Sequence, residues 1–102
     1  MKRIMVRYKV KPERVTENQN LIEQVFEQLS RERPAGVRYA AFKLADGVTF
    51  IHIVSIETSD GTNPLTNMAA FRDFVAQIRE RCVDLPVPVE LIEIESYHFF
   101  GH

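Results

Sequence analysis

The chain has 102 residues, a net charge of −1 and 45% hydrophobic residues, a composition typical of one globular domain, so residues 1–102 are expected to form a single domain. No basic block offers a surface for nucleic acid, and no apolar run is long enough to cross a membrane. The single cysteine excludes an internal disulfide, and no signal peptide is visible. We therefore expect a cytoplasmic protein.

The N-terminal third predicts a strand followed by a helix. Apolar and polar residues alternate over residues 4–11, and Pro12 ends this strand. Residues 16–19 match the Thr-x-x-Gln capping box, so the helix is expected to begin at Thr16. An apolar stripe at helical spacing follows, and Pro34 and Gly36 stop the helix.

Two strand-like segments, residues 37–45 and 48–56, are joined by Asp46-Gly47, which predicts a hairpin with a type I′ turn. A two-residue loop also sets the register, placing Lys43 opposite Phe50 and Ala41 opposite His52. Both faces of this hairpin are largely apolar, so each requires a cover.

The C-terminal part predicts a second helix and a last strand. Asn63-Pro64 favours a helix start, and apolar residues at helical spacing continue to Cys82, so a helix is expected over residues 64–81. Residues 85–88 contain two prolines and break it. The last strand is then expected over residues 89–100.

This order predicts an α+β, ferredoxin-like β-α-β-β-α-β fold, in which a four-stranded antiparallel sheet carries two helices on one face. The residues expected to face the helices are Ile4, Val6, Tyr8, Val10, Phe42, Ile51, Ile53, Ile92 and Ile94. Those expected on the opposite face are Met5, Arg7, Tyr39, Phe50, His52, Val54, Ile56, Leu91, Tyr97 and Phe99. A patch this apolar predicts a homodimer through the sheet.

Segments spread over nearly the whole chain resemble the dimeric α/β-barrel superfamily, and more narrowly the antibiotic biosynthesis monooxygenase-like domains. These segments are residues 3–10 (RIMVRYKV), 33–36 (RPAG), 46–52 (DGVTFIH), 63–65 (NPL) and 96–101 (SYHFFG). The resemblance implies a dimeric α/β barrel of two sheets packed face to face, with a small-molecule cavity between helices and sheet. The chain departs from members that use a tryptophan near the pocket and from haem-degrading members with a histidine on the second helix, so haem degradation is disfavoured.

The catalytic candidates are His52, Arg7 and Tyr39. A histidine in the middle of an apolar strand suits general-base chemistry near neutral pH, or is a core histidine that Tyr39, Arg7 or a partner-chain group satisfies. Arg7 is either a clamp for an anionic substrate or one half of an interface ion pair with Glu93 or Glu95.

The substrate-binding candidates are Tyr8, Asn18, Phe26, Phe71 and Phe74, because an amide and a phenol in an aromatic cleft suit a flat ligand. Alternatively, Asn18 caps the first helical turn and the aromatic residues are ordinary core. Cys82 is expected to be a buried, inert thiol. His98 and His102 have no further ligands to complete a metal site, and neither a metal nor a cofactor is expected.

Two functions remain open at this point. The first is a cofactor-independent monooxygenase-like enzyme, or an isomerase, that acts on a small aromatic or polyketide-like compound in the helix–sheet cleft. The second is a non-catalytic dimeric module that binds a small ligand or only assembles. The sequence does not identify a substrate.

Overall fold

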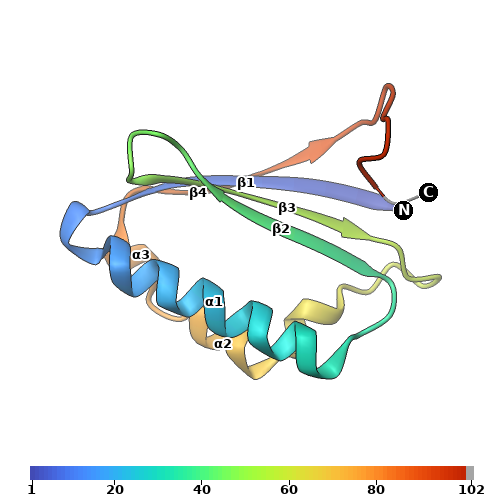
Figure 1. Ribbon diagram of the computed structural model, residues 1–102, viewed down its shortest axis with the longest axis horizontal. Coiled ribbons are helices and arrows are strands. Elements are labelled where there is room, and N and C mark those ends of the chain that lie inside the picture. Colours follow the sequence, from blue (N-terminus) through green and yellow to red (C-terminus); the bar gives the residue numbers. More distant parts are fainter. Residues whose placement is uncertain (101–102) are drawn as a thin grey trace.

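In the computed structural model, which describes residues 1–100, four strands form one antiparallel sheet and the helices cover one of its faces (Figure 1). The sheet order is β2-β3-β1-β4, and the strands are β1 (Lys2–Val10), β2 (Val37–Lys43), β3 (Thr49–Ile56) and β4 (Cys82–Leu91). The helices are α1 (Val15–Glu32), α2 (Ala69–Val75) and α3 (Ile78–Arg81), with 3-10 turns η1 (Pro12–Arg14) and η2 (Pro64–Asn67). The predicted α+β, ferredoxin-like arrangement is confirmed.

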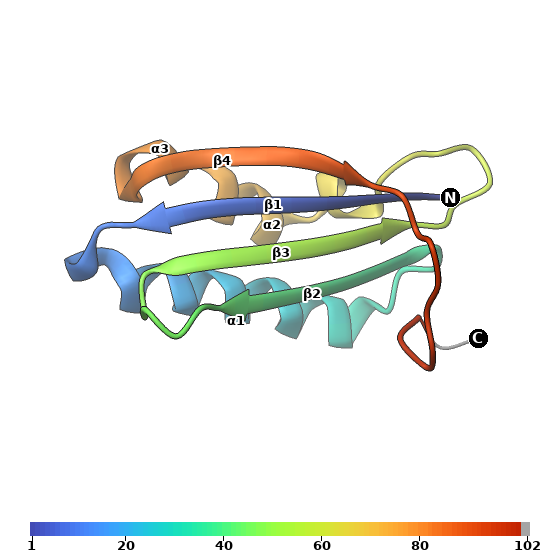
Figure 2. The ribbon, with the colours of Figure 1, turned by 90° about the horizontal axis from the view of Figure 1, so that it is seen from above.

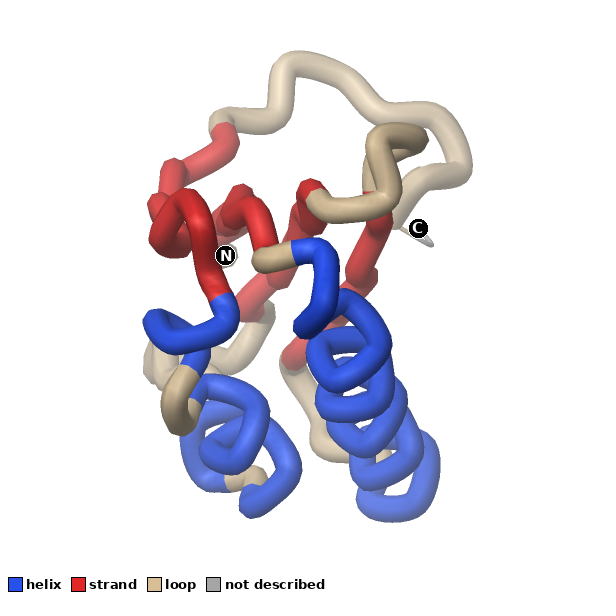
Figure 3. Tube along the Cα trace, turned by 90° about the vertical axis from the view of Figure 1, so that its left-hand side faces the viewer, coloured by secondary structure: helices blue, strands red, loops and turns tan. Residues whose placement is uncertain are grey.

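Helix α1 lies beside the α2 and α3 segments on the same side of the sheet (Figure 3). It begins at Val15, directly after η1, and no side chain caps its N-terminus. The predicted capping box at Thr16 is therefore wrong, because the 3-10 turn that starts at Pro12 runs straight into the helix. Arg33 ends the helix in the left-handed conformation, with φ of 49°.

The hairpin has the predicted register, with Lys43 paired to Phe50 and Ala41 to His52. Its turn is not type I′, because Gly47 has positive φ and Asp46 does not. Instead, the Asp46 carboxylate accepts hydrogen bonds from the backbone N–H groups of Val48 and Thr49 and from the Thr49 hydroxyl. The bond from the Thr49 hydroxyl, followed by those from the two backbone groups, lowers the pKa of Asp46 to about 2.

The pairing of β1 with β3 decides which face of the hairpin meets the helices. Tyr8 pairs with Phe50, and cross-strand partners share a face, so the face that carries Phe50 packs under the helices. The residues of β2 and β3 on this inner face are Val37, Tyr39, Ala41, Lys43, Phe50, His52, Val54 and Ile56. The sequence pattern groups the residues of each hairpin face correctly but predicts the wrong side for each face, because Phe42, Ile51 and Ile53 lie on the outer face. His52 is consequently a residue of the helix side, not of the outer face.

The predicted second helix is interrupted twice. Met68 is extended between η2 and α2, and Gln77 adopts the left-handed conformation, with φ of 61°, between α2 and α3. The second break leaves backbone carbonyl groups without helical donors. The Arg81 guanidinium donates to two of them, the carbonyl oxygens of Phe74 and Ala76, at 2.6 and 3.2 Å.

The last strand lies earlier in the chain than predicted. Strand β4 contains the Leu85–Pro88 segment that was expected to be a break. An edge strand tolerates proline because only one of its sides is paired, and β4 pairs with β1 alone. Residues 92–100 form an irregular tail that crosses the ends of the other strands (Figure 2). Ile92 and Ile94, expected in the core, are 80% and 91% exposed.

Candidate functional site

A cavity of about 270 Å³ lies between the inner face of the sheet and the η2–α3 segment. None of the described residues that line it carries a charged side chain. They are Ile4, Val6, Tyr8, Tyr39, His52, Val54, Asn63, Leu65, Phe71, Phe74, Val75, Ile78, Pro86 and Pro88. Such a lining suits a small, uncharged, flat ligand, and its few polar groups would set the ligand's orientation.

His52 connects two tyrosines in this cavity. Its Nε2 atom lies 2.7 Å from the Tyr8 hydroxyl, and its Nδ1 atom is hydrogen bonded to the Tyr39 hydroxyl. The three residues come from three neighbouring strands, and the β1–β3–β2 register brings them together. Because burial disfavours the charged imidazolium, the pKa of His52 is lowered to about 4 and the ring is neutral at pH 7.

The hydrogen bonds continue from Tyr8 into the helical layer. Asn18 of α1 donates from Nδ2 to the Tyr8 hydroxyl at 2.9 Å, and Arg81 of α3 donates from Nε to Asn18 Oδ1 at 3.2 Å. Asn18 is fully buried and Arg81 is 1% exposed. Burial raises the pKa of both Tyr8 and Tyr39 well above the usual value, so both hydroxyls stay protonated near neutral pH. We call the row Arg81–Asn18–Tyr8–His52–Tyr39 the buried network.

Aromatic rings enclose the buried network. Phe50 stacks on Tyr8 with the ring centroids 5.5 Å apart, and Phe74 stacks on His52 at 5.2 Å. Phe26 stacks on Tyr39 at 5.1 Å. These rings restrict water around the hydrogen bonds, and a hydrogen bond in such a medium is stronger than one in water.

The cavity brings together Tyr8, Tyr39, His52, Phe71 and Phe74, five of the eight predicted site residues. Asn18 lies behind Tyr8, where it is neither a helix cap nor part of the cavity lining. Phe26 lies behind Tyr39 and lines a different depression, with Ser30 and Arg33 among its other residues.

Arg7 is separated from the cavity. Successive strand residues point to opposite faces, and since Tyr8 faces inward, Arg7 is exposed on the outer face. The ion pair of Arg7 with Glu93 or Glu95, the alternative interpretation of this residue, does not form within residues 1–100. Strands β1 and β4 are neighbours as expected, but Glu93 belongs to the tail and its partner is Arg3.

Sequence reasoning missed Arg81, Pro86 and Pro88. Arg81 follows Ile78 by three residues, a spacing that places both on one face of a helix, so the apolar stripe already contained a signal for a buried arginine. The sequence pattern predicts only that Pro86 and Pro88 end the second helix. Cys82 is buried as predicted, and burial raises the pKa of its thiol.

The remaining candidate side chains do not assemble a second site. His98 is exposed in the tail, and His102 lies outside the described residues. Residues 1–100 contain no group of three or more potential metal ligands. In the same part of the chain, no helix has the length and apolarity needed to span a bilayer.

No protein-family model and no curated protein sequence matches the chain. Solved structures do match it. An antibiotic biosynthesis monooxygenase superposes with a TM-score of 0.75 at 17% identity, covering 93% of this chain and 100% of that one. Rv0793 from Mycobacterium tuberculosis superposes with a TM-score of 0.74 at 14% identity, covering 93% of this chain and 96% of that one.

SnoaB, a cofactor-independent oxygenase from Streptomyces nogalater, superposes with a TM-score of 0.68 at 11% identity, covering 93% of this chain and 94% of that chain. At these identities the likeness concerns the fold. The likeness spans the sheet and both helical segments, because it covers nearly the whole of each chain. The chain therefore has the fold of the antibiotic biosynthesis monooxygenase-like proteins.

Proposed function

We propose that this protein is a cofactor-independent monooxygenase-like enzyme that acts on a small aromatic or polyketide-like compound in the cavity. One observation carries the proposal: an uncharged, mainly apolar cavity contains a tyrosine–histidine–tyrosine row of hydrogen bonds. The apolar walls would hold a flat ring, and the Tyr39 hydroxyl would contact an oxygen of that ring.

The reaction needs no separate reductant. An activated methylene carbon of the substrate loses two hydrogens and gains one atom of O₂ as a carbonyl oxygen, and the other oxygen atom leaves with those hydrogens as water. The substrate itself supplies all four electrons. His52, with its pKa of about 4, is a weak base. The substrates that fit are therefore acidic phenols or enols that ionise without strong help from the protein.

A non-catalytic ligand-binding module is the second candidate, and one observation favours it. Both ring nitrogens of His52 are already hydrogen bonded to tyrosines, so neither is free to remove a proton from a substrate. Under this alternative the cavity binds the same class of flat compound but leaves it unchanged.

Ligand binding is tested by a thermal-shift screen with phenols, quinones and short acids, using a variant that blocks the cavity. Val75 lines the cavity and is 44% exposed, so Val75→Trp is expected to fill its entrance at little cost in stability and to weaken binding at least about tenfold. Val83→Trp is the matched control, because Val83 is 55% exposed and lies outside the cavity lining.

Each compound that binds is then tested for oxygen consumption without added cofactor. We expect turnover that falls about 10²-fold in Tyr39→Phe, because that change removes a hydrogen bond to a developing oxyanion. Binding without oxygen consumption would favour the non-catalytic module. Equal binding by the Val75→Trp and Val83→Trp variants would contradict the cavity as the ligand site.

A homodimer through the outer face of the sheet forms the second part of the proposal. Phe42, Val87 and Val89 are 50%, 58% and 45% exposed on or beside this face. The tail next to it also exposes large apolar side chains, among them Tyr97 at 87%. Exposed apolar area of this extent is typical of a surface that another protein covers.

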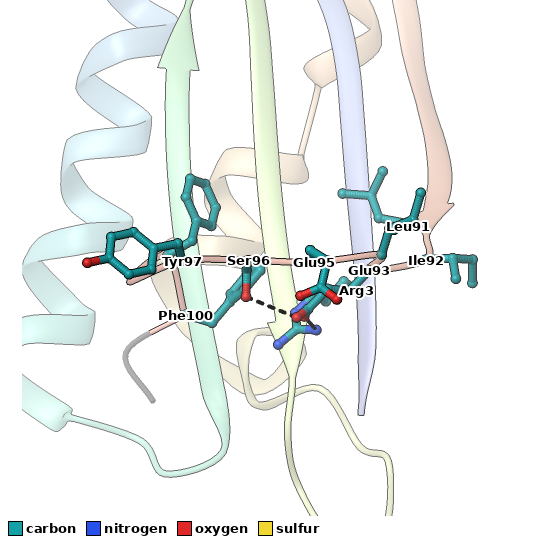
Figure 4. Close-up of a pocket in the computed structure, with 10 residues that line it drawn as sticks. Arg3, Leu91, Ile92, Glu93, Glu95, Ser96, Tyr97 and Phe100 are labelled. Carbon is teal, nitrogen blue, oxygen red and sulfur yellow. Dashed lines mark hydrogen bonds and ion pairs between the residues drawn. The ribbon is translucent and has the colours of Figure 1, made fainter.

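Arg3 of β1 attaches the tail to the sheet next to this face. It is 7% exposed, and its Nη1 atom is paired with Glu93, which also accepts a hydrogen bond from Ser96 (Figure 4). The Nε and Nη2 atoms have no hydrogen-bond partner within residues 1–100. The chain itself covers these atoms, and the Phe100 ring lies over the guanidinium, 3.7 Å from its central carbon, so Arg3 holds the tail beside the proposed contact.

Light scattering coupled to size-exclusion chromatography is expected to give the mass of two chains at micromolar concentration. Val89→Arg should produce the mass of one chain, because a charge placed within an apolar contact is desolvated without a partner. Gln24→Arg, on the exposed side of α1, is the matched control and should remain dimeric. A wild-type protein with the mass of one chain would contradict the homodimer.

A further inference from the structure

The buried network ends at a cation that the proposed chemistry does not use. We propose that Arg81, acting through Asn18, gives all hydrogen bonds of the buried network one direction, so that Tyr39 is left as a donor to a carbonyl, enolate or phenolate oxygen in the cavity. Arg81 and Asn18 are then positioning residues. The ligand class rests on the proposed function, whereas the direction of the network is a property of the protein alone.

The direction is set at the Arg81 end. An arginine side chain only donates hydrogen bonds, so the Asn18 atom 3.2 Å from Arg81 Nε has to be the amide oxygen. The Asn18 nitrogen therefore faces Tyr8, and it donates to the Tyr8 hydroxyl oxygen at 2.9 Å. The opposite orientation of the Asn18 amide would place two donors against each other.

The direction then passes through Tyr8 and His52. The Tyr8 hydroxyl has two partners among the described residues, Asn18 and His52. Asn18 donates to the Tyr8 oxygen, so the remaining hydrogen bond of this hydroxyl uses its own hydrogen. Tyr8 therefore donates to His52 Nε2, 2.7 Å away. A neutral imidazole with an unprotonated Nε2 carries its proton on Nδ1, so His52 donates to the Tyr39 oxygen.

In this arrangement the hydroxyl hydrogen of Tyr39 has no acceptor within the buried network, and Tyr39 lines the cavity. Every donor in the network points from the buried cation towards the cavity, so the bond dipoles reinforce one another. Within residues 1–100, Arg81 forms no salt bridge, and its remaining hydrogen bonds are to backbone carbonyls. The cavity end of the network is consequently suited to an oxygen that carries negative charge.

Asn18→Asp provides the sharpest test because it is expected to reverse the network without breaking it. The introduced carboxylate pairs with Arg81 and has no proton to donate, so Tyr8 must donate to it instead. The Tyr8 oxygen then accepts from His52 Nε2, and Tyr39 donates to Nδ1. Nitrogen-15 NMR of the ligand-free protein should show the His52 proton on Nδ1 in the wild type and on Nε2 in Asn18→Asp.

Asn20→Asp is the matched control, because it introduces the same charge at an exposed position of α1 and should leave the proton on Nδ1. The His52 signals are assigned by their absence from His52→Gln. A second pair of variants removes the cation: Arg81→Met should give a mixture of both His52 tautomers, whereas Arg79→Met, at an exposed position of the same helix, should keep Nδ1–H. A wild-type proton on Nε2, or an unchanged tautomer in Asn18→Asp, would overturn the proposal.

The ligand class is tested with 1,4-naphthoquinone, which only accepts hydrogen bonds, and naphthalene, which has no acceptor. The wild type should bind the quinone about three- to tenfold more tightly than naphthalene, and Asn18→Asp should lose that preference. An equal preference in both proteins would overturn the role of the network in ligand choice. If neither compound binds while the tautomer reverses as expected, the proposed function is wrong and the direction of the network stands.

Discussion

Replacing Phe50 with alanine is expected to lower the free energy of unfolding by about 4 kcal/mol, because truncating a buried aromatic ring removes its transfer free energy and leaves a cavity. Phe50 is 2% exposed, and its ring stacks on Tyr8 with the centroids 5.5 Å apart. Phe50 belongs to β3, which pairs with β1 on one side and β2 on the other, so the surrounding backbone has little freedom to collapse into the space. Urea unfolding followed by circular dichroism measures the change.

Phe42→Ala is the matched control for Phe50→Ala. It removes the same ring from the neighbouring strand, where Phe42 is 50% exposed on the outer face. Both changes are made in the Val89→Arg background, so that any contact between chains does not contribute. Phe42→Ala should then cost less than about 1.5 kcal/mol. A larger loss for Phe42 than for Phe50 would mean that the opposite face of the hairpin packs under the helices.

Acidification from pH 7 to pH 4.5 is expected to remove about 2 kcal/mol of stability through His52 alone. In the unfolded chain His52 has its ordinary pKa near 6.5, whereas burial lowers the folded-state pKa to about 4. Between these two values the unfolded chain binds a proton that the folded chain does not. The contribution is therefore fully present above pH 6.5 and is lost as the pH falls towards 4.

The comparison of the wild type with His52→Gln isolates this effect, because glutamine does not titrate. Acidic side chains also contribute to acid unfolding: hydrogen bonds from Thr49 and Ser55 lower the pKa of Asp46 and Glu57 respectively. Those groups are present in both proteins, so the difference between the two pH profiles belongs to His52. His98→Gln, at an exposed position in the tail, should follow the wild-type profile. Parallel profiles for the wild type and His52→Gln would contradict the lowered pKa.

Local pattern predicted much of the fold. The alternation of residues 4–11, the helical stripe that follows and the Asp46-Gly47 turn lie in β1, α1 and the β2–β3 hairpin. Each signal comes from neighbouring residues whose backbone periodicity is the same in any context. The hairpin register was correct even though the turn type was not, because the alternating strands on both sides of the turn constrain the pairing.

The local sequence pattern also indicated Tyr8, Tyr39 and His52 as candidate site residues, each on its own, because each is a polar side chain among apolar neighbours. Their assembly into one row depends on the pairing of β1 with β3, and no tight turn connects those strands. The same pairing sends Phe50 and His52 inward and leaves Phe42 on the outer face. A two-sided apolar hairpin gives no local indication of which side the helices will cover.

The sequence by itself thus determined the β-α-β-β-α-β order, the main helix and the hairpin register, since these follow from the spacing of residues close together in the chain. Tertiary structure decided the position of the last strand, because an edge strand tolerates Pro86 and Pro88. It also decided the burial of Arg81, which binds backbone carbonyl groups at the break in the second helix. Tertiary structure also decided which residues come together in the candidate site. Contacts between residues as distant as Asn18 and Arg81 depend on how the elements pack, and no local pattern encodes that packing.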